Sequence, residues 1–352
     1  MTYVEAGLGG VVAAILTYVA TFPIRRHAHA LGLLDLPGER SSHRVATPRG
    51  GGIAIMLGTA AGLAVLSALS GRVGSEAWTL FGVAAAVGAV GLVDDRFGLS
   101  PVSKLVAQIA GAVVLVVAFG PVVDVAVPSP FDGAVARSLL AWGLSVLWLT
   151  TVVNFFNFMD GIDGLAAGQA LASCIGIVAA AWSGDATVVT LSVGAACLGF
   201  LFHNAPRARI FMGDSGSGFL GFVLAAAPFA APPPRRGEAL LAVAIGLSLF
   251  LLDPIRTLIK RAYERKNIFR AHREHLYQEL VAPDEPAGRV AATYSAAALL
   301  LALCGAAGYR WPPMFWVGGL AGAIAFLLVW QRARRASRTR SAAGPTGMPL
   351  HW

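Results

Sequence analysis

Long apolar runs recur along almost the whole chain, each near the roughly 20 residues that an α-helix needs to cross the hydrocarbon core of a bilayer. Of the 352 residues, 56% are hydrophobic and only 13% are charged, whereas soluble domains are about 25% charged. We count eleven runs, at residues 3–22, 50–70, 78–93, 104–120, 138–158, 165–183, 187–203, 215–231, 238–259, 290–308 and 313–331. The sequence therefore predicts an all-α polytopic membrane helix bundle of about eleven transmembrane helices, or ten if one of the shorter runs does not cross.

The polar segments are too short to form a soluble domain, since the longest, at about 260–289, cannot bury an independent core. We expect one integral membrane domain at residues 1–331 and a disordered basic tail at 332–352. No basic residue precedes the first run, so we interpret it as a retained helix and not as a signal peptide. The three cysteines lie inside apolar runs, without the spacing of a disulfide framework or zinc site, and are interpreted as packing residues.

The basic residues are distributed unequally between the two sides that eleven spans define. Of the 27 Lys and Arg residues, 22 fall on one side, and the positive-inside rule makes that side cytoplasmic. The N-terminus is then outside and the C-terminus inside, which fits a bacterial cytoplasmic membrane protein. This topology also explains the net charge of +8. We therefore expect the tail to contact membrane lipids, and we expect no nucleic-acid partner.

Acidic residues gather at the same predicted cytoplasmic boundary, although the rule for basic residues does not require it. Asp94 and Asp95 end the third run, Asp160 and Asp163 follow the fifth, and Asp214 follows the seventh. Adjacent carboxylates resist joint ionisation unless a cation neutralises them, and oxygen ligands suit Mg²⁺ or Mn²⁺ better than zinc. Any single pair could simply end a helix at the water interface. Three clusters on one face favour a metal-dependent site.

Two further segments place polar groups near these carboxylates. Asn154, Asn157, Asp160 and Asp163 recur every third residue in apolar sequence, and successive members are neighbours on a helix. The asparagines alone could form hydrogen bonds between helices, but the four polar residues together indicate a functional site. The glycine-rich segment 204–218, which contains Asp214, opens the eighth span, where backbone N–H groups favour phosphate. Small residues there could also serve helix packing.

Two predicted cytoplasmic loops carry cations. The first, at 35–52, contains His43 and ends in Pro-Arg49-Gly-Gly-Gly; it is either an ordinary topogenic loop or an anion site. The last contains His272, Arg273 and His275, and we expect the histidines to share a helix face at i, i+3. Contact with a diphosphate is at least as plausible for them as metal ligation, and simple surface solvation is the alternative.

Taken in order, these motifs resemble the polyprenyl-phosphate N-acetylhexosamine-1-phosphate transferases. The resemblance runs from about Asp35 to Leu280 and rests on Pro-Arg-Gly-Gly-Gly, the Asp94-Asp95 pair with Lys104 downstream, NFFNFMDGIDGLAAG, NAPRARIFMGDSGSGFLG and AHREHLYQ. It implies a fold of ten or eleven helices and transfer of a sugar-1-phosphate from a UDP-sugar to polyprenyl phosphate. A homodimer is a further expectation.

The resemblance also implies roles for individual residues. Asp94, Asp95 and Asp214 match the catalytic carboxylates, and we take Asp95 and Asp214 as the Mg²⁺ ligands. The residues expected to bind substrate are Lys104, Asn157, Asp160, Asp163, Asn204, Phe211, His43, Arg49, His272, Arg273 and His275. Among these, Asp163, Asn204 and Phe211 match positions that hold the uridine, with Phe211 stacking on uracil.

Two departures from the family pattern concern the choice of sugar. Gly98 replaces a third acidic residue of the first motif, and the histidine cluster is reduced to His-Arg-Glu-His. The reduced histidine cluster is similar to that of the branch that initiates O-antigen or other surface polysaccharides.

The main alternative to a transferase is a secondary transporter with a proton or ion relay at Asp253-Pro254, since transporter sites lie near the midplane on broken helices. A lipid-binding scaffold protein is a third possible function, but it would not require three acidic clusters on one face.

Overall fold

The computed structural model describes residues 2–35, 46–71, 73–122, 133–181, 184–267, 272–281 and 286–342. Its elements are α1 (Tyr3–His27), β1 (Leu34–Asp35), β2 (Thr47–Pro48), α2 (Gly51–Ser70), α3 (Ser75–Phe97), α4 (Pro101–Phe119), α5 (Ala134–Phe158), α6 (Leu165–Ala180), α7 (Gly184–Asn204), α8 (Gly213–Ala226), the 3₁₀ turns η1 (Ala227–Ala230) and η2 (Pro233–Arg235), α9 (Arg236–Gly246), α10 (Ser248–Tyr263), α11 (Leu276–Leu280), α12 (Ala287–Arg310) and α13 (Met314–Ala342). The prediction of an all-α bundle is confirmed.

Within the described residues, eight helices are long and apolar enough to cross a membrane, with mean hydropathies of 1.7–2.2 over their best windows. A ninth crossing is possible where Gly213–Ala230 meets Pro233–Gly246 at a bend of 118°. Apolar side chains on the outer helices face away from the bundle, as Val117 on α4 and Trp316 on α13 illustrate. Such a surface suits contact with lipid chains, because apolar groups exposed to water are unfavourable.

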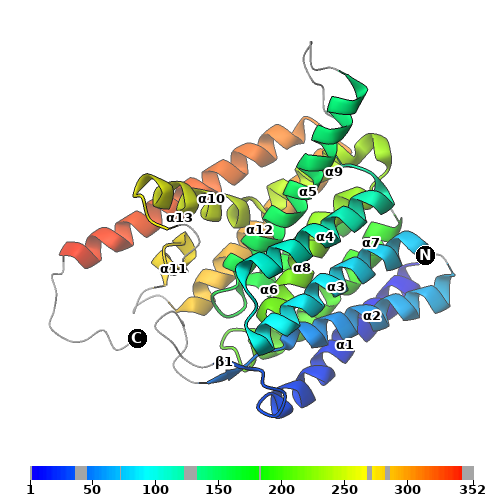
Figure 1. Cartoon of the computed structure of the whole chain (residues 1–352), viewed down its shortest axis with the longest axis horizontal. Coiled ribbons are helices and arrows are strands. Elements are labelled where there is room, and N and C mark those ends of the chain that lie inside the picture. The colour runs from blue at the N-terminus through cyan, green and yellow to red at the C-terminus, as the bar shows by residue number, and fades with distance from the viewer. Residues whose placement is uncertain are drawn as a thin grey trace.

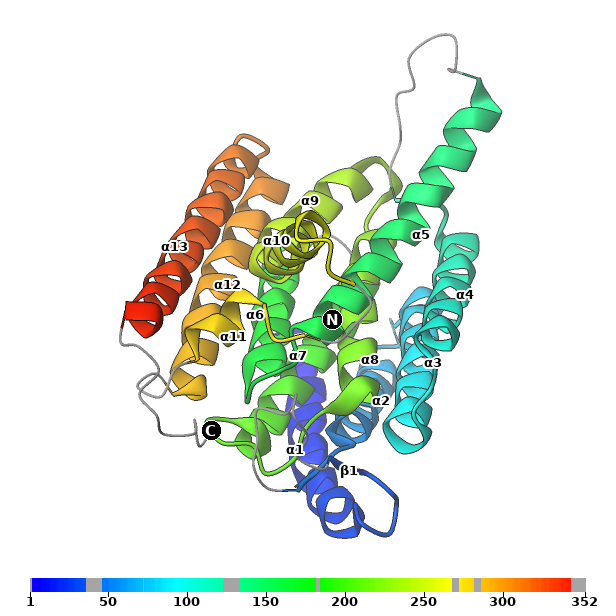
Figure 2. The ribbon, with the colours of Figure 1, turned by 60° about the vertical axis from the view of Figure 1, so that its left-hand side comes forward.

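The run predicted as one continuous helix at 238–259 is in fact two helices, α9 and α10. The chain breaks at Leu247 between α9 and α10. The buried Gln169 side chain donates a hydrogen bond of 3.0 Å to the Gly246 carbonyl at the end of α9. That bond satisfies a carbonyl that would otherwise lack a partner in an apolar interior. Figure 2 shows α10 nearly end-on beside α12 and α13.

The buried centre of the bundle is α8, in which every residue from Ser215 to Ala226 is buried. It packs against α2, α3 and α5, and in Figure 1 it lies among the other long helices. A Cβ atom on Gly91 of α3 would lie 2.2 Å from the Asp214 carbonyl oxygen. Glycine therefore allows the end of α3, with its two aspartates, to touch the start of α8.

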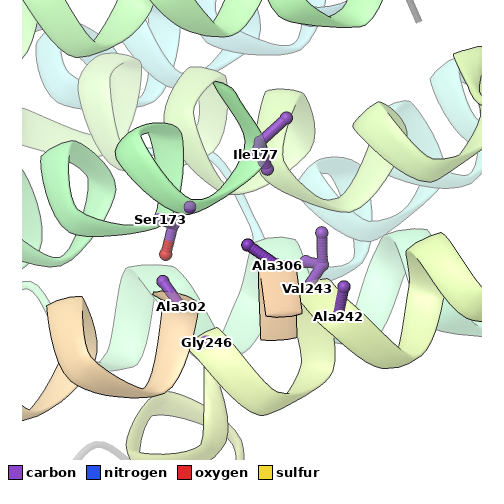
Figure 3. Close-up of a pocket in the computed structure, with 8 residues that line it drawn as sticks. Ser173, Ile177, Ala242, Val243, Gly246, Ala302 and Ala306 are labelled. Atoms are coloured by element: carbon purple, nitrogen blue, oxygen red, sulfur yellow. The ribbon is translucent and has the colours of Figure 1, made fainter. Parts of the chain in front are cut away.

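Small residues also join α6, α9 and α12, as Figure 3 shows around Ser173, Gly246 and Ala302. The gap that they leave is only about 10 Å³, close to the volume needed for one water. Small residues at such interfaces let membrane helices approach closely.

The two ends of the described chain lie on opposite sides of the bundle in Figure 1, with the start of α1 far from the end of α13. The expectation that the tail after residue 331 lacks structure does not hold for residues 332–342, which continue α13. The rest of that tail lies outside the described residues.

Candidate active site

One polar pocket is lined by residues of β1, of α11 and of several helix ends. Its volume is about 470 Å³. The lining residues are Asp35, Arg49, Asp95, Asn157, Asp160, Gly161, Ile162, Asp163, Asn204, Phe211, Gly213, Asp214, Gln278 and Ala287. Eight of the fourteen predicted site residues are in this set, so residues more than 100 positions apart meet here as the sequence predicted.

Lys104 forms two ion pairs next to the pocket. It lies on the first turn of α4, which starts at Pro101 with Ser100 as the N-cap, and its Nζ is 2.7 Å from Asp94 Oδ2 and 2.8 Å from Asp214 Oδ2. Asp94 also accepts a 2.6 Å hydrogen bond from the Leu99 amide. Asp94 thus contacts Lys104 and does not line the pocket itself.

Asp95 and Asn157 fix the start of α8 from two other helices. The Asp95 carboxylate accepts hydrogen bonds from the amides of Asp214, at 2.9 Å, and Ser215, at 3.1 Å. A carboxylate at the positive end of a helix is well placed electrostatically. The Asn157 amide donates to Asp214 Oδ1 at 3.0 Å and to Ser217 Oγ at 2.9 Å. These contacts orient the Asp214 carboxylate towards the pocket.

Asp160 is the least compensated carboxylate of the pocket. Within the described part of the chain its side chain has no hydrogen bond, and no cation pairs with it. Burial, followed by repulsion from Asp214, Asp95 and Asp163, raises the pKa of Asp160 to about 8. Without a further positive charge in the pocket, this group is therefore protonated at neutral pH.

Asp163, Asn204 and Phe211 all line the pocket. The Asp163 carboxylate accepts a 2.8 Å hydrogen bond from the Ala208 amide. The buried Asn204 amide accepts from the Gly164 amide at 2.9 Å and donates to the Ile210 carbonyl at 3.0 Å. It therefore ties the α5–α6 turn to the α7–α8 loop. Phe211 is half-buried.

From the first loop, Arg49 reaches the pocket and pairs with Asp35 at 2.5 Å. Asp35 is itself paired with Thr47 in the short β1–β2 ladder, and Arg49 directly follows β2. The predicted contact of His43 lies outside the described residues.

The histidine loop is arranged differently from the expectation. His272 and His275 do not share a helix face, because α11 begins only after His275, which is its N-cap. The two rings lie 4.9 Å apart between centroids, His275 is buried, and Arg273 is exposed. None of the three lines the pocket. Burial and the neighbouring His275 and Arg261 lower the pKa of His272 to about 4, so His272 is neutral at pH 7.

Gln278 and Asp35 line the pocket although they were not among the predicted site residues. Gln278 belongs to the AHREHLYQ motif, so the motif pointed to the right segment but to other side chains. The Asn154 amide, the first member of the three-residue series, donates at 2.6 Å to Gln108 on α4. Asn154 therefore joins α5 to α4 by a side-chain hydrogen bond.

The donor set of the pocket fits a divalent cation in its chemistry, although no three His, Cys, Asp or Glu side chains in the described ranges converge into a ready-made metal site. Four carboxylates line the pocket besides Asp35, which Arg49 pairs. Lys104 is the cation that neutralises Asp214. A hard cation such as Mg²⁺ would favour the ionised forms of the other pocket carboxylates. Asp95, Asp160 and Asp214 are the residues that would hold it.

Comparison with known proteins identifies the class to which this fold and site belong. Residues 77–231 match the family model described as glycosyl transferase family 4. This segment includes Asp94, Lys104, Asn157 and Asp214, which together form the ion-paired centre described above.

Individual relatives narrow the class further. The chain is 37% identical to the decaprenyl-phosphate N-acetylglucosaminephosphotransferase of Mycobacterium tuberculosis (strain ATCC 25618 / H37Rv), over 79% of this chain and 76% of the relative. It is 30% identical to the probable undecaprenyl-phosphate N-acetylglucosaminyl 1-phosphate transferase of Bacillus subtilis (strain 168), over 77% and 76%. It is also 30% identical to the phospho-N-acetylmuramoyl-pentapeptide-transferase of Desulforudis audaxviator (strain MP104C), over 87% and 98%. The chain therefore belongs to the polyprenyl-phosphate N-acetylhexosamine-1-phosphate transferase family.

Proposed function

We propose that this protein transfers an N-acetylhexosamine-1-phosphate, with N-acetylglucosamine as the first candidate sugar, from a UDP-sugar to a polyprenyl phosphate. The observation that carries the proposal is the convergence of Asp95, Asp160, Asp163 and Asp214 on one pocket, beside a lysine that pairs with Asp214. Family membership supports the reaction class, and the names of the two N-acetylglucosamine relatives support the sugar. Initiation of O-antigen or another surface polysaccharide stays a prediction.

In the proposed reaction, a phosphate oxygen of the lipid acceptor attacks the phosphorus that carries the sugar. The bond from that phosphorus to the oxygen bridging the two phosphates breaks, and UMP leaves with the electron pair. A phosphate monoester with a second pKa near 6 is largely dianionic at neutral pH, so the acceptor needs no strong base. Positioning and charge supply most of the acceleration in such phosphoryl transfers.

The residues of the pocket suit these tasks. Lys104, held by Asp94 at 2.7 Å, would offset charge on the phosphates, and Asp94 would thus act as its positioning residue. Asp95, Asp160 and Asp214 would hold Mg²⁺ or Mn²⁺, which when bound would neutralise the diphosphate and assist the departure of UMP. Phe211, half-buried at the pocket wall, would stack on uracil.

A lipid acceptor is supported by a second cavity. An apolar space of about 490 Å³ between α6, the end of α7 and α12 shares Asp163 with the polar pocket. A lipid chain would find hydrocarbon surroundings there within reach of the carboxylates. A cytoplasmic position of the pocket, in the inner membrane, is the orientation that the distribution of basic residues favours.

A panel of labelled donors tests the proposal. Purified protein would be incubated with polyprenyl phosphate and UDP-GlcNAc, UDP-GalNAc or a 6-deoxy UDP-HexNAc, and lipid product and UMP would be quantified. We expect UMP and lipid-linked diphospho-sugar in equal amounts with UDP-GlcNAc. No turnover of any donor would contradict the proposal.

A covalent aspartyl-phosphate intermediate is the alternative mechanism. It predicts exchange of labelled UMP into the UDP-sugar in the complete absence of lipid. Direct attack predicts no such exchange, so its detection would contradict the direct mechanism.

A further inference from the structure

Asp253 is a buried carboxylate on α10 that does not line the pocket. Only 1% of its surface is exposed. A carboxylate withdrawn from water is costly unless hydrogen bonds or a cation compensate it. The groups that approach Asp253 therefore show what it stabilises.

Those groups come mainly from the start of α11. Asp253 Oδ1 accepts a 2.9 Å hydrogen bond from the Leu276 amide, and Oδ2 accepts one of 3.3 Å from the Tyr277 amide. His275 Nδ1 lies 3.3 Å from Oδ1. The remaining contact is the Thr257 hydroxyl, at 3.3 Å on the same helix. Asp253 thus anchors α11, whose first amides have no partner within so short a helix.

Ion pairs on either side strengthen this attachment of α11 to α10. Arg261, itself buried, pairs with Glu274 at 2.6 Å, and Arg256 lies 3.3 Å from Glu279. Glu274 and Glu279 stand on either side of the residues that contact Asp253, whereas both arginines follow Asp253 on α10. These side-chain contacts tie α11 to α10, and α11 also packs against α13.

From α11, contacts continue to the turn that carries two pocket carboxylates. The hydroxyl of the buried Tyr277 donates a 3.1 Å hydrogen bond to the Phe158 carbonyl, at the end of α5. It also fills the space beside Gly161, where a Cβ atom would lie 2.0 Å from it. Phe158 and Gly161 flank Asp160, and the next residue on α11, Gln278, lines the pocket.

We propose that Asp253 is a positioning residue of the transferase, holding α11 so that Tyr277 fixes the turn with Asp160 and Asp163 and Gln278 faces the donor. This proposal rests on the proposed function for its kinetic part. It gives Asp253 a different role from the ion relay of a transporter, because Asp253 accepts hydrogen bonds from the first backbone amides of α11.

The test compares Asp253→Asn, Tyr277→Phe and Gln169→Leu in the full-length protein in detergent or nanodiscs. Gln169 is a matched control, because it is also buried and polar, and its hydrogen bonds go to Ser173 on its own helix and to the end of α9. Hydrogen–deuterium exchange of residues 272–281 and steady-state kinetics with the UDP-sugar are measured for each variant.

For Asp253→Asn we expect exchange at the Leu276 and Tyr277 amides to accelerate about tenfold or more, since Asn has one acceptor oxygen where Asp has two, and its NH2 group cannot accept a hydrogen bond. Exchange in α6 and α7 should not change, while kcat/KM should fall about tenfold or more with a raised donor KM. Tyr277→Phe should lower kcat/KM with normal exchange at Leu276. Gln169→Leu should lower thermal stability but leave the donor KM unchanged.

Unchanged exchange at residues 272–281 in Asp253→Asn would overturn the anchoring role. Accelerated exchange with unchanged kinetics in an active enzyme would overturn the positioning role. Exchange requires no substrate. If the wild-type protein turned over no donor while exchange was still accelerated in Asp253→Asn, the proposed function would be contradicted and the anchoring role would stand.

Discussion

At the scale of single residues, Lys104 is the most informative side chain, because it joins carboxylates from two helices. The topology predicted from the sequence placed Lys104, Asp94 and Asp214 on one side of the membrane, and the family resemblance implied that Lys104 lies beside the carboxylates. The sequence did not predict that Lys104 would form ion pairs with both Asp94 and Asp214. That arrangement depends on the close contact of α3 with α8, and sequence positions alone contain no distances.

Replacing Lys104 with Met keeps the length of the side chain but removes its charge. We expect kcat/KM for sugar-phosphate transfer to fall about 100-fold or more, since a preorganised charge at the reacting phosphates is lost. The exposed Arg26 on α1 offers a matched control, and Arg26→Met should retain wild-type activity. Loss of activity in both variants would instead indicate a general effect of removing a basic residue.

The raised pKa of Asp160 predicts that the stability of the metal-free protein depends on pH. This pKa of about 8 in the folded state lies above the value near 3.9 of an unfolded chain. The folded state therefore binds one more proton between these values, and the free energy of unfolding should decrease as pH rises through that range. Thermal unfolding of metal-free protein between pH 5 and 9 measures this effect.

Asp160→Asn provides the comparison for that measurement. The variant should show a flatter decline of stability with pH, because its amide does not titrate. Wild type and Asp160→Asn with parallel pH profiles would show that Asp160 does not titrate in this range.

At the scale of elements, the eleven apolar runs located the helices well, but not the break between α9 and α10. Hydropathy continues through Leu247, and the Gln169 side chain that satisfies the Gly246 carbonyl comes from a helix 77 residues away. The segment with His272 and His275 was predicted to be helical from its i, i+3 spacing. Spacing alone could not show that the helix begins only after His275, which is its N-cap. The buried Asp253 beneath it determines that start.

The contact of α3 with α8 can be tested at Gly91. A Cβ atom at Gly91 would lie 2.2 Å from the Asp214 carbonyl oxygen, whereas one at Gly82 on the same helix meets nothing within 4 Å. Gly91→Ala should therefore destabilise the protein by about 1–3 kcal/mol through overpacking and should lower activity. Gly82→Ala should do neither. Equal effects of the two substitutions on melting temperature and transfer rate would contradict the predicted role of this contact.

At the scale of the whole molecule, the fold separates two environments. Exposed apolar side chains surround the long helices, and five carboxylates, including that of Asp35, line one pocket at a single end of the bundle. A charged donor can then reach the pocket from water while a lipid acceptor approaches from the bilayer. Composition and periodicity predicted this separation, and the topology of the chain brought the separate motifs into one pocket.

The central claim is that this pocket transfers a sugar-phosphate and that Asp214 is essential for the reaction. The most direct test measures transfer of labelled sugar-1-phosphate from UDP-GlcNAc to polyprenyl phosphate, with Mg²⁺ and after chelation, by wild type, Asp214→Asn and Asp185→Asn. Asp185 is a suitable control, because it lies at the opposite end of α7 from the pocket and accepts a hydrogen bond from the Gly74 amide. We predict metal-dependent lipid product from wild type and Asp185→Asn, and at least about a 100-fold loss in Asp214→Asn. Undiminished, chelator-resistant transfer by Asp214→Asn would contradict the account.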